Sequence, residues 1–170
     1  MRLISVLQKD LARLGGRGAF DALKWYFVPR GECFPYVFWL RLLQYVRNHQ
    51  ILRYTIGIPV YCIYRHFEFK YGTHANANIE IGEGLRIVHG PCNLNAARIG
   101  KNFTVYSGVT IGCNKGAIPN IGDNVSIYSN AVVVGGIDIG NNVVIGALSY
   151  VGHSLEDGVR YIPKKNEATN

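Results

Sequence analysis

The stretch that decides the fold is residues 121–133, which read IGDNVSIYSNAVV. Ile121, Ile127 and Val133 follow one another at intervals of six, and the third residue after each of the first two is asparagine. A β-branched side chain favours an extended backbone, whereas asparagine and glycine tolerate the left-handed conformation of a tight corner. Each six-residue unit is therefore expected to form one short strand and one bend. A period of six is not a multiple of 3.6, which argues against a helix.

The same period continues in two registers, which a four-residue insertion separates. Eleven of the twelve positions expected to point inward are Ile or Val, and nine of the twelve positions three residues later are Gly or Asn. A single unit cannot bury its apolar face, so the units must stack into a solenoid. With three units to a turn, twelve units predict about four coils. The expected inward positions are Ile81, Ile87, Asn93, Ile99, Val105 and Ile111, then Ile121, Ile127, Val133, Ile139, Ile145 and Val151.

The first 70 residues have a different composition from the remainder. They hold 11 Lys and Arg against 4 Asp and Glu, and 14 of the 20 aromatic residues, whereas residues 71–170 hold seven charges of each sign. We therefore predict a helical region over 1–70, a β-helix over 71–158 and a C-terminal tail over 159–170. Apolar residues at helical spacing predict helices over 2–14, 20–27, 35–48 and 52–70, the last interrupted at Gly57 and Pro59.

Two roles are open for the basic, aromatic region. It either packs on the rest of the chain as a cap that assists oligomerisation, or contacts a membrane surface. Nucleic acid binding is not expected, because the sequence has no recognition-helix, finger or stacking-sheet pattern. The residues behind the membrane hypothesis are Phe34, Tyr36, Phe38, Trp39 and Leu40, among Arg30, Arg41, Arg47 and Arg53.

Composition and cysteine spacing narrow the class of protein further. The 170 residues are 48% apolar and 17% charged, which indicates a globular chain. No apolar run is long enough to span a membrane, and residues 1–5 do not resemble the start of a secretory signal. The four cysteines are too widely spaced for a CxxC site, so no metal centre is predicted and reduced thiols are expected. A cytoplasmic protein is expected, with attachment to the inner face of the cell membrane if residues 1–70 contact lipid.

Three segments within the repeats resemble a known family: GLRIVHG at 84–90, IGKN at 99–102 and VTIG at 109–112. They are similar to the hexapeptide-repeat acyltransferases, in the serine acetyltransferase-like branch that includes enzymes acetylating sugars of surface polysaccharides. The helical leader also resembles that branch, and the repeat match covers about residues 72–155. The resemblance implies a mainly β fold, a left-handed parallel β-helix, together with a homotrimer and acetyl-CoA as the acetyl donor.

The resemblance assigns the catalytic base to His89. A hydroxyl is a weak nucleophile at neutral pH, and a neutral imidazole accepts its proton as the oxygen attacks a thioester. The family places an aspartate fifteen residues before this histidine, where this sequence has His74. Either His74 orients the base, or another acceptor such as Glu83 or a backbone carbonyl does so. His74 is therefore the second candidate catalytic residue.

The acceptor is expected to be a sugar hydroxyl in surface polysaccharide biosynthesis. Serine acetyltransferases carry an Arg-His-Pro run whose histidine helps to hold the amino acid, and Ile118 replaces that histidine here. Asn93 and Asn95 are candidate substrate-binding residues. Two alternatives stay open: a serine O-acetyltransferase of cysteine biosynthesis, and a β-helix scaffold without catalysis.

The resemblance also implies positions for the donor. Contacts of the family with the pantetheine arm fall, by position, at Cys113, Ser129 and Ala147. Lys115 and Lys164 are candidates for its phosphates.

Overall fold

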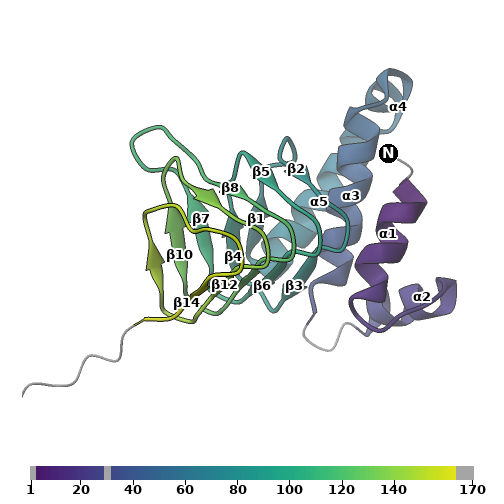
Figure 1. The fold of residues 1–170 in the computed structure, drawn as a ribbon. Helices are drawn as coiled ribbons and strands as arrows, with labels where there is room; N and C mark the ends of the chain where they lie inside the picture. Colours follow the sequence, from purple (N-terminus) through teal and green to yellow (C-terminus); the bar gives the residue numbers. More distant parts are fainter. Residues whose placement is uncertain (1–2, 29–31, 164–170) are drawn as a thin grey trace, which may run out of the picture.

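The computed structural model describes residues 3–28 and 32–163, where a layer of helices precedes a stack of short strands (Figure 1). Helices form where the sequence predicts them, because apolar side chains recur there at helical spacing. The break predicted near Gly57 and Pro59 falls at Ile56, between two helices. The helices are α1 (Leu3–Ala12), α2 (Ala19–Phe27), α3 (Phe34–Arg47), α4 (Gln50–Thr55) and α5 (Gly57–Tyr71).

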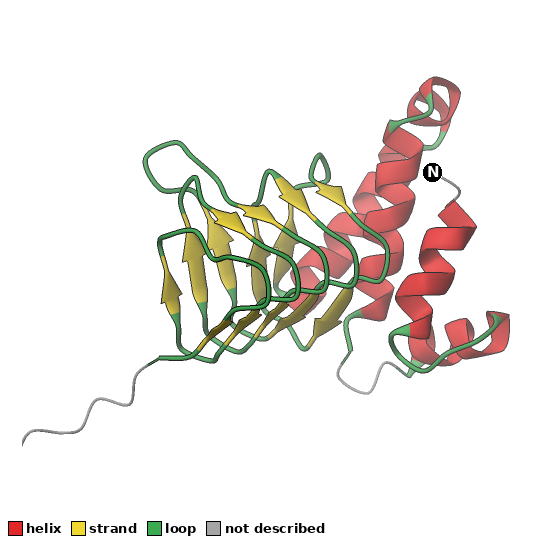
Figure 2. Ribbon diagram, viewed as in Figure 1, coloured by secondary structure: helices red, strands yellow, loops and turns green. Residues whose placement is uncertain are grey.

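The strands build a parallel β-solenoid with three sheets (Figure 2). Each of the first ten strands pairs in parallel with the strand three places later, and the twelfth pairs with the fourteenth. The first sheet contains β1 (Thr73–Ala75), β4 (Cys92–Leu94), β7 (Thr110–Gly112), β10 (Val132–Val134) and β13 (Tyr150–Val151). The second contains β2 (Glu80–Ile81), β5 (Arg98–Ile99), β8 (Asn120–Ile121) and β11 (Asp138–Ile139). The third contains β3 (Arg86–Val88), β6 (Thr104–Tyr106), β9 (Ser126–Ile127), β12 (Val144–Ile145) and β14 (Arg160–Tyr161).

The solenoid has about five turns rather than the four counted from the repeats. The difference arises at its two ends, where β1 and β14 lie outside the twelve repeat positions and still pair into sheets. Arg160 and Tyr161, which the sequence assigns to the tail, therefore belong to the last turn.

The core of the solenoid is the stack of inward side chains. Eleven of the twelve predicted inward positions are buried, and Asn93 is the exception. Asn93 points outward, because the bend after β3 holds one residue more than the repeat, and Leu94 takes the inward place opposite Ile111. The next interval, from Leu94 to Ile99, is five residues and restores the register. The prediction that Asn93 points inward is therefore wrong.

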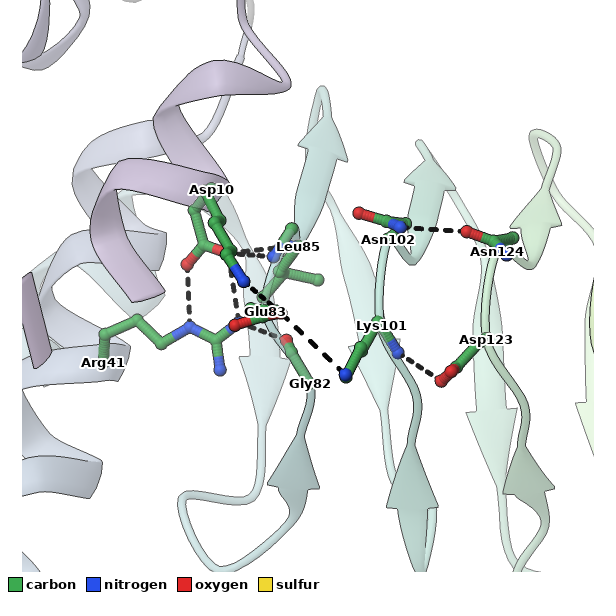
Figure 3. Close-up of polar contacts among 11 residues, drawn as sticks. Asp10, Arg41, Gly82, Glu83, Leu85, Lys101, Asn102, Asp123 and Asn124 are labelled. Carbon is green, nitrogen blue, oxygen red and sulfur yellow. Dashed lines mark hydrogen bonds and ion pairs between the residues drawn. The ribbon is translucent and has the colours of Figure 1, made fainter. Parts of the chain in front are cut away.

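Left-handed residues occupy seven of the twelve predicted corners. They follow strands of the second and third sheets, whereas the corner after the first sheet turns differently in each coil. Asparagine side chains at these corners also bond from coil to coil: Asn102 donates to Asn124 at 2.9 Å (Figure 3). The seven are Gly84, Asn102, Gly108, Asn124, Asn130, Asn142 and Leu148.

A buried ion pair ties the helical layer to the first coil (Figure 3). The Arg41 guanidinium donates from Nε to Asp10 at 2.8 Å and from its terminal nitrogens to the carbonyls of Ile81 and Gly82 at 2.7 and 2.6 Å. Asp10 also accepts the backbone N–H of Leu85 at 2.8 Å. Burial raises the pKa of Asp10, while the Arg41 charge and the backbone donors act in the opposite direction.

Four of the nine residues behind the membrane hypothesis lie in the interior. Phe34, Tyr36, Leu40 and Arg41 are buried between the helices and the first coil, and Arg30 lies outside the described residues. These four side chains are not available to a membrane, whereas Arg47 and Arg53 are exposed, so contact of residues 1–70 with a membrane stays a prediction. The cap alternative agrees with the packing of α3 on β3, where Cys33 N donates to Ile87 O at 3.0 Å.

Asp10→Ala should destabilise the protein strongly, because it leaves the Arg41 charge buried without a counter-ion. Loss of one partner of such a pair costs about 3–5 kcal/mol, measurable by urea denaturation. Lys9→Gln is the control, since the Lys9–Glu83 pair lies in solvent, which screens it. An equal, small effect of both changes would show that Asp10 does not anchor the helices.

Leu148→Asn should stabilise the solenoid. Leu148 has a φ of 60° and is exposed, at a corner where the preceding coil has Asn130. A left-handed residue with a branched side chain costs about 1–2 kcal/mol, part of which asparagine recovers. Leu148→Ala keeps the Cβ atom and should bring little gain, so a free energy of unfolding that rises equally in both variants would contradict this account.

Candidate active site

His89 follows β3 directly and forms the corner between the third and the first sheet. Its backbone is left-handed, with a φ of 59°, and its side chain is exposed. The sequence predicts Gly90 as the corner residue, and the structure places the corner one residue earlier, at His89 itself. Histidine is among the residues that tolerate this conformation better than most. The ring therefore stands outside the solenoid, at the edge between two sheets.

The bend at His89 passes close to the end of α5. A Cβ atom on Gly90 would lie 2.0 Å from the carbonyl oxygen of Tyr71 and 2.9 Å from Oγ1 of Thr73. Only glycine fits this approach, which is a close packing requirement rather than a need for positive φ. The His89 corner and the start of β1 are therefore neighbours.

The first sheet brings two of the predicted site residues together. His74 of β1 points outward, and the pairing register places it opposite Asn93 of β4. Asn95 follows on the same outward side, because Cys92 and Leu94 take the inward places. His74, Asn93 and Asn95 thus share one surface, which begins at the bend after His89.

A carboxylate that the sequence did not suggest lies behind His74. The Glu68 side chain is buried on α5 and contacts Nδ1 of His74 and the guanidinium of Arg65. Tyr64 lies beside it and donates its hydroxyl to the carbonyl of Ala75 at 2.7 Å. Burial raises the pKa of Tyr64 to about 12, so the hydroxyl stays protonated. The sequence held one signal for this carboxylate. Glu68 comes four residues after Tyr64, so both lie on the same apolar face of the helix.

Glu83, the other orienting group considered from the sequence, serves elsewhere. Its carboxylate accepts a hydrogen bond from Nζ of Lys9 at 2.5 Å. It also lies 4.0 Å from Nζ of Lys101 (Figure 3). The lysine hydrogen bond lowers the pKa of Glu83. The contacts of this carboxylate therefore lie at the interface with α1 and not with the His89 corner.

Cys92 is buried next to the corner, with Sγ 3.2 Å from the Tyr106 carbonyl oxygen and 3.7 Å from that of His89. Burial raises the pKa of its thiol to about 11. A nucleophilic cysteine needs the opposite shift. Cys92 is therefore suited to holding the corner and not to carrying an acyl group.

One edge of the solenoid carries the left-handed corner of successive coils. Backbone bonds connect the corners, with Asn130 N donating to Ser107 O and Leu148 N to Ser129 O, both at 3.0 Å. We call this column the His89 edge; it consists of His89, Gly108, Asn130 and Leu148.

The predicted donor-binding residues divide between two edges. Ser129 and Ala147 immediately precede the corners of the third and fourth coils, so they lie on the His89 edge. Cys113 and Lys115 are exposed in the inserted loop after β7, which leaves the solenoid at the end of the first sheet, at a different corner. Within one chain the structure does not bring these two to His89. Lys164 lies outside the described residues.

Two stacked tyrosines on the His89 edge were missed from the sequence. The rings of Tyr106 and Tyr128 are parallel within 8°, with centroids 4.7 Å apart. Tyr106 is opposite Val88, the residue before His89, in the pairing of β6 with β3. Their separation of 22 residues is one coil plus the inserted loop, a spacing that places them in register.

Two further observations concern metal ions and membranes. Among residues 3–28 and 32–163, no group of three His, Cys, Asp or Glu side chains is arranged to bind a metal ion. None of the helices in these ranges is long and apolar enough to cross a bilayer.

Comparisons with known proteins agree with this architecture. The bacterial transferase hexapeptide family (six repeats) matches residues 119–153. A serine acetyltransferase of Staphylococcus xylosus is 36% identical over 110 residues, which cover 62% of this chain and 45% of that protein. The chain thus spans less than half the length of this curated relative.

Solved structures show the same fold. The serine acetyltransferase of Neisseria gonorrhoeae in complex with serine aligns with a TM-score of 0.71 and 24% identity, covering 92% of this chain and 64% of that one. A serine acetyltransferase in complex with CoA aligns with a TM-score of 0.70 and 17% identity, covering 91% and 64%. In its six-residue units and its solenoid, the chain is similar to the hexapeptide-repeat serine acetyltransferases.

Proposed function

We propose that this protein is an O-acetyltransferase that moves an acetyl group from acetyl-CoA to the hydroxyl of serine. One observation carries the proposal: an exposed histidine stands on an edge shared with Ser129 and Ala147, in coils similar to those of serine acetyltransferases. A relative has been solved with CoA and another with serine, which supports this donor and this acceptor. A reduced, cytoplasmic setting fits the free cysteines of the described chain.

In the proposed reaction, His89 moves the proton of the acceptor. Its neutral imidazole accepts the hydroxyl proton while the oxygen forms a bond to the thioester carbonyl carbon. The C–S bond then breaks, and the CoA sulfur leaves with the proton returned by the imidazolium. A positioned base of this kind contributes about 10²–10⁴-fold to the rate.

His74 and Glu68 support this base in the proposal. The Glu68 carboxylate accepts a hydrogen bond from Nδ1–H of His74, so Nε2 of His74 is the unprotonated nitrogen. An unprotonated Nε2 is an acceptor, which is the role that the aspartate has in the resembled family. His74 with its carboxylate thus replaces one acidic side chain by a pair.

We include a homotrimer in the proposal. Cys113 and Lys115 leave the solenoid at a different corner from His89, and a neighbouring subunit offers a way to bring the two corners together. The loop would then contribute to a donor groove whose other wall is the His89 edge.

The comparisons favour serine over the sugar hydroxyl that the sequence suggested, because the relatives are serine acetyltransferases. One observation supports a sugar as the second candidate: Ile118 stands where the resembled family has a substrate-holding histidine. The stacked Tyr106 and Tyr128 add an aromatic platform next to His89, a surface on which a sugar ring can pack.

Release of free CoA thiol from acetyl-CoA, with serine or a panel of sugars as acceptors, tests the proposal. We expect release with serine, and His89→Ala should lower turnover by at least about a hundredfold. His153→Ala, an exposed histidine of the last turn, is the matched control. Release with sugars alone would transfer the proposal to the second candidate.

A scaffold without catalysis would give a different result. It would show no thiol release with any acceptor and no binding of acetyl-CoA, and either finding in combination with a folded protein would remove the enzymatic proposal.

Glu68→Gln should lower turnover while leaving binding of acetyl-CoA unchanged. The new amide can donate to Nδ1 of His74, which moves the proton to Nε2 and removes the acceptor that the proposal assigns to orienting His89. The nitrogen resonances of the His74 ring would report this exchange of tautomers. Glu80→Gln, at an exposed carboxylate of β2, is the control. Unchanged turnover with the exchanged tautomer would exclude His74 from positioning the base.

A further inference from the structure

The outward surface of α4 and α5 is apolar, although α5 already buries another side. Val60 and Tyr64 of α5 pack inward, whereas Ile58 is 79% exposed. Helix α4 buries none of its residues, and its Ile51 and Tyr54 are 79% and 84% exposed. A helix that is apolar all round is normally buried all round, and the outer side of α5 has no partner among residues 3–28 and 32–163. Clustered apolar side chains on a surface mark an interaction site.

A groove of about 260 Å³ lies at the centre of this surface, between the end of α3 and the start of α5. Its walls are apolar, and two arginines stand among the lining residues. We call the exposed surface around it the α4–α5 face, comprising Ile51, Tyr54, Ile58 and Tyr61 with Arg47 and Arg53.

The charge on this segment has one sign. Between residues 47 and 71 the sequence has four Lys and Arg, and its one carboxylate is Glu68. Glu68 is buried and engaged by Arg65 and His74, so it does not neutralise the face. The groove lining contains no acidic residue. Arg47 and Arg53 therefore present positive charge beside exposed apolar side chains.

We propose that the α4–α5 face docks this protein on the surface of an anionic lipid bilayer. Ile51, Tyr54 and Ile58 would enter the interface between headgroups and acyl chains, while Arg47 and Arg53 would meet lipid phosphates. Both contributions to membrane binding come from this face: its apolar side chains can be buried in the bilayer, and its arginines attract anionic headgroups. This set shares Arg47 and Arg53 with the one the sequence suggested, and it replaces the aromatic residues of α3 by exposed residues of α4 and α5.

A second copy of the chain fits the face less well. Two copies meeting through the same face would place Arg47 and Arg53 of both copies in one interface, with no carboxylate on the face to pair with them. Like charges placed opposite one another oppose association. An anionic bilayer supplies the missing negative charge.

The position of the face leaves the candidate active site accessible. Figure 1 shows α4 at the tip of the helical layer, extending beyond the solenoid. No helix of the described ranges can span a bilayer, so the proposed attachment is peripheral. The proposal does not depend on the acetyl transfer, because lipid binding is measured without donor or acceptor.

Flotation of the full chain with vesicles tests the inference. We expect binding to vesicles of equal parts phosphatidylcholine and phosphatidylglycerol, little binding to pure phosphatidylcholine, and weaker binding as salt increases. Arg47→Gln with Arg53→Gln should reduce the partition coefficient by about thirtyfold, since each cation near an anionic surface contributes about a factor of five. Ile51→Ser with Ile58→Ser should also reduce it.

Matched changes on the solenoid provide the controls. Arg98→Gln with Arg160→Gln removes two exposed cations, and Tyr150→Ser with Ile162→Ser removes two exposed apolar side chains, so both pairs should float like the parent. Absence of flotation, or equal loss in the controls, would overturn the proposal. Self-association that disappears in Ile51→Ser with Ile58→Ser, without any lipid binding, would assign the face to a second copy instead.

Discussion

The structure depends on the stacking of inward side chains in the solenoid, one layer upon the next. Each coil has an apolar interior only three short strands wide, so a lone coil would expose most of what it buries. Ile87, Val105, Ile127 and Ile145 lie one above another in the third sheet and are all buried. The parallel pairing that stacks them also fixes the corners in columns. An outward side chain at one corner is therefore held at a set height along an edge, which is how the fold places His89.

The helical layer closes one end of this stack. The first coil would otherwise expose its apolar layer and its unpaired backbone groups. Arg41 satisfies two of those carbonyls and pairs with Asp10, while the aromatic side chains of α3 cover the layer. The same helices contribute Glu68, whose carboxylate reaches His74 on the outside of the first coil. End closure and support of the candidate site thus come from one packing arrangement. The outer side of α4 and α5, which closes nothing, is the surface left for a partner.

The departures from the resembled family lie at two places in the structure. His74 replaces an acidic residue, and the structure supplies a carboxylate from α5 at its ring. Ile118 replaces a histidine in the inserted loop, away from the His89 edge. The tyrosine pair at Tyr106 and Tyr128 lies on that edge instead. In the proposed reaction the acceptor would be recognised on the His89 edge and the first sheet, where His74, Asn93 and Asn95 point outward.

The sequence by itself determined the solenoid, the burial of eleven inward positions and the order of helices, because each follows from side chains at a fixed local spacing. It also placed His89 at an edge of the solenoid, although the corner residue is His89 itself and not Gly90. It could not place Asn93, since one extra residue in the bend after His89 reverses which side of the strand faces the core. Only the tertiary structure decided that Glu68 contacts His74, that Ser129 and Ala147 share an edge with His89, and that Phe34, Tyr36 and Leu40 are interior. Those relations join residues from different coils and helices, and the packing that brings them together is not encoded in any local period.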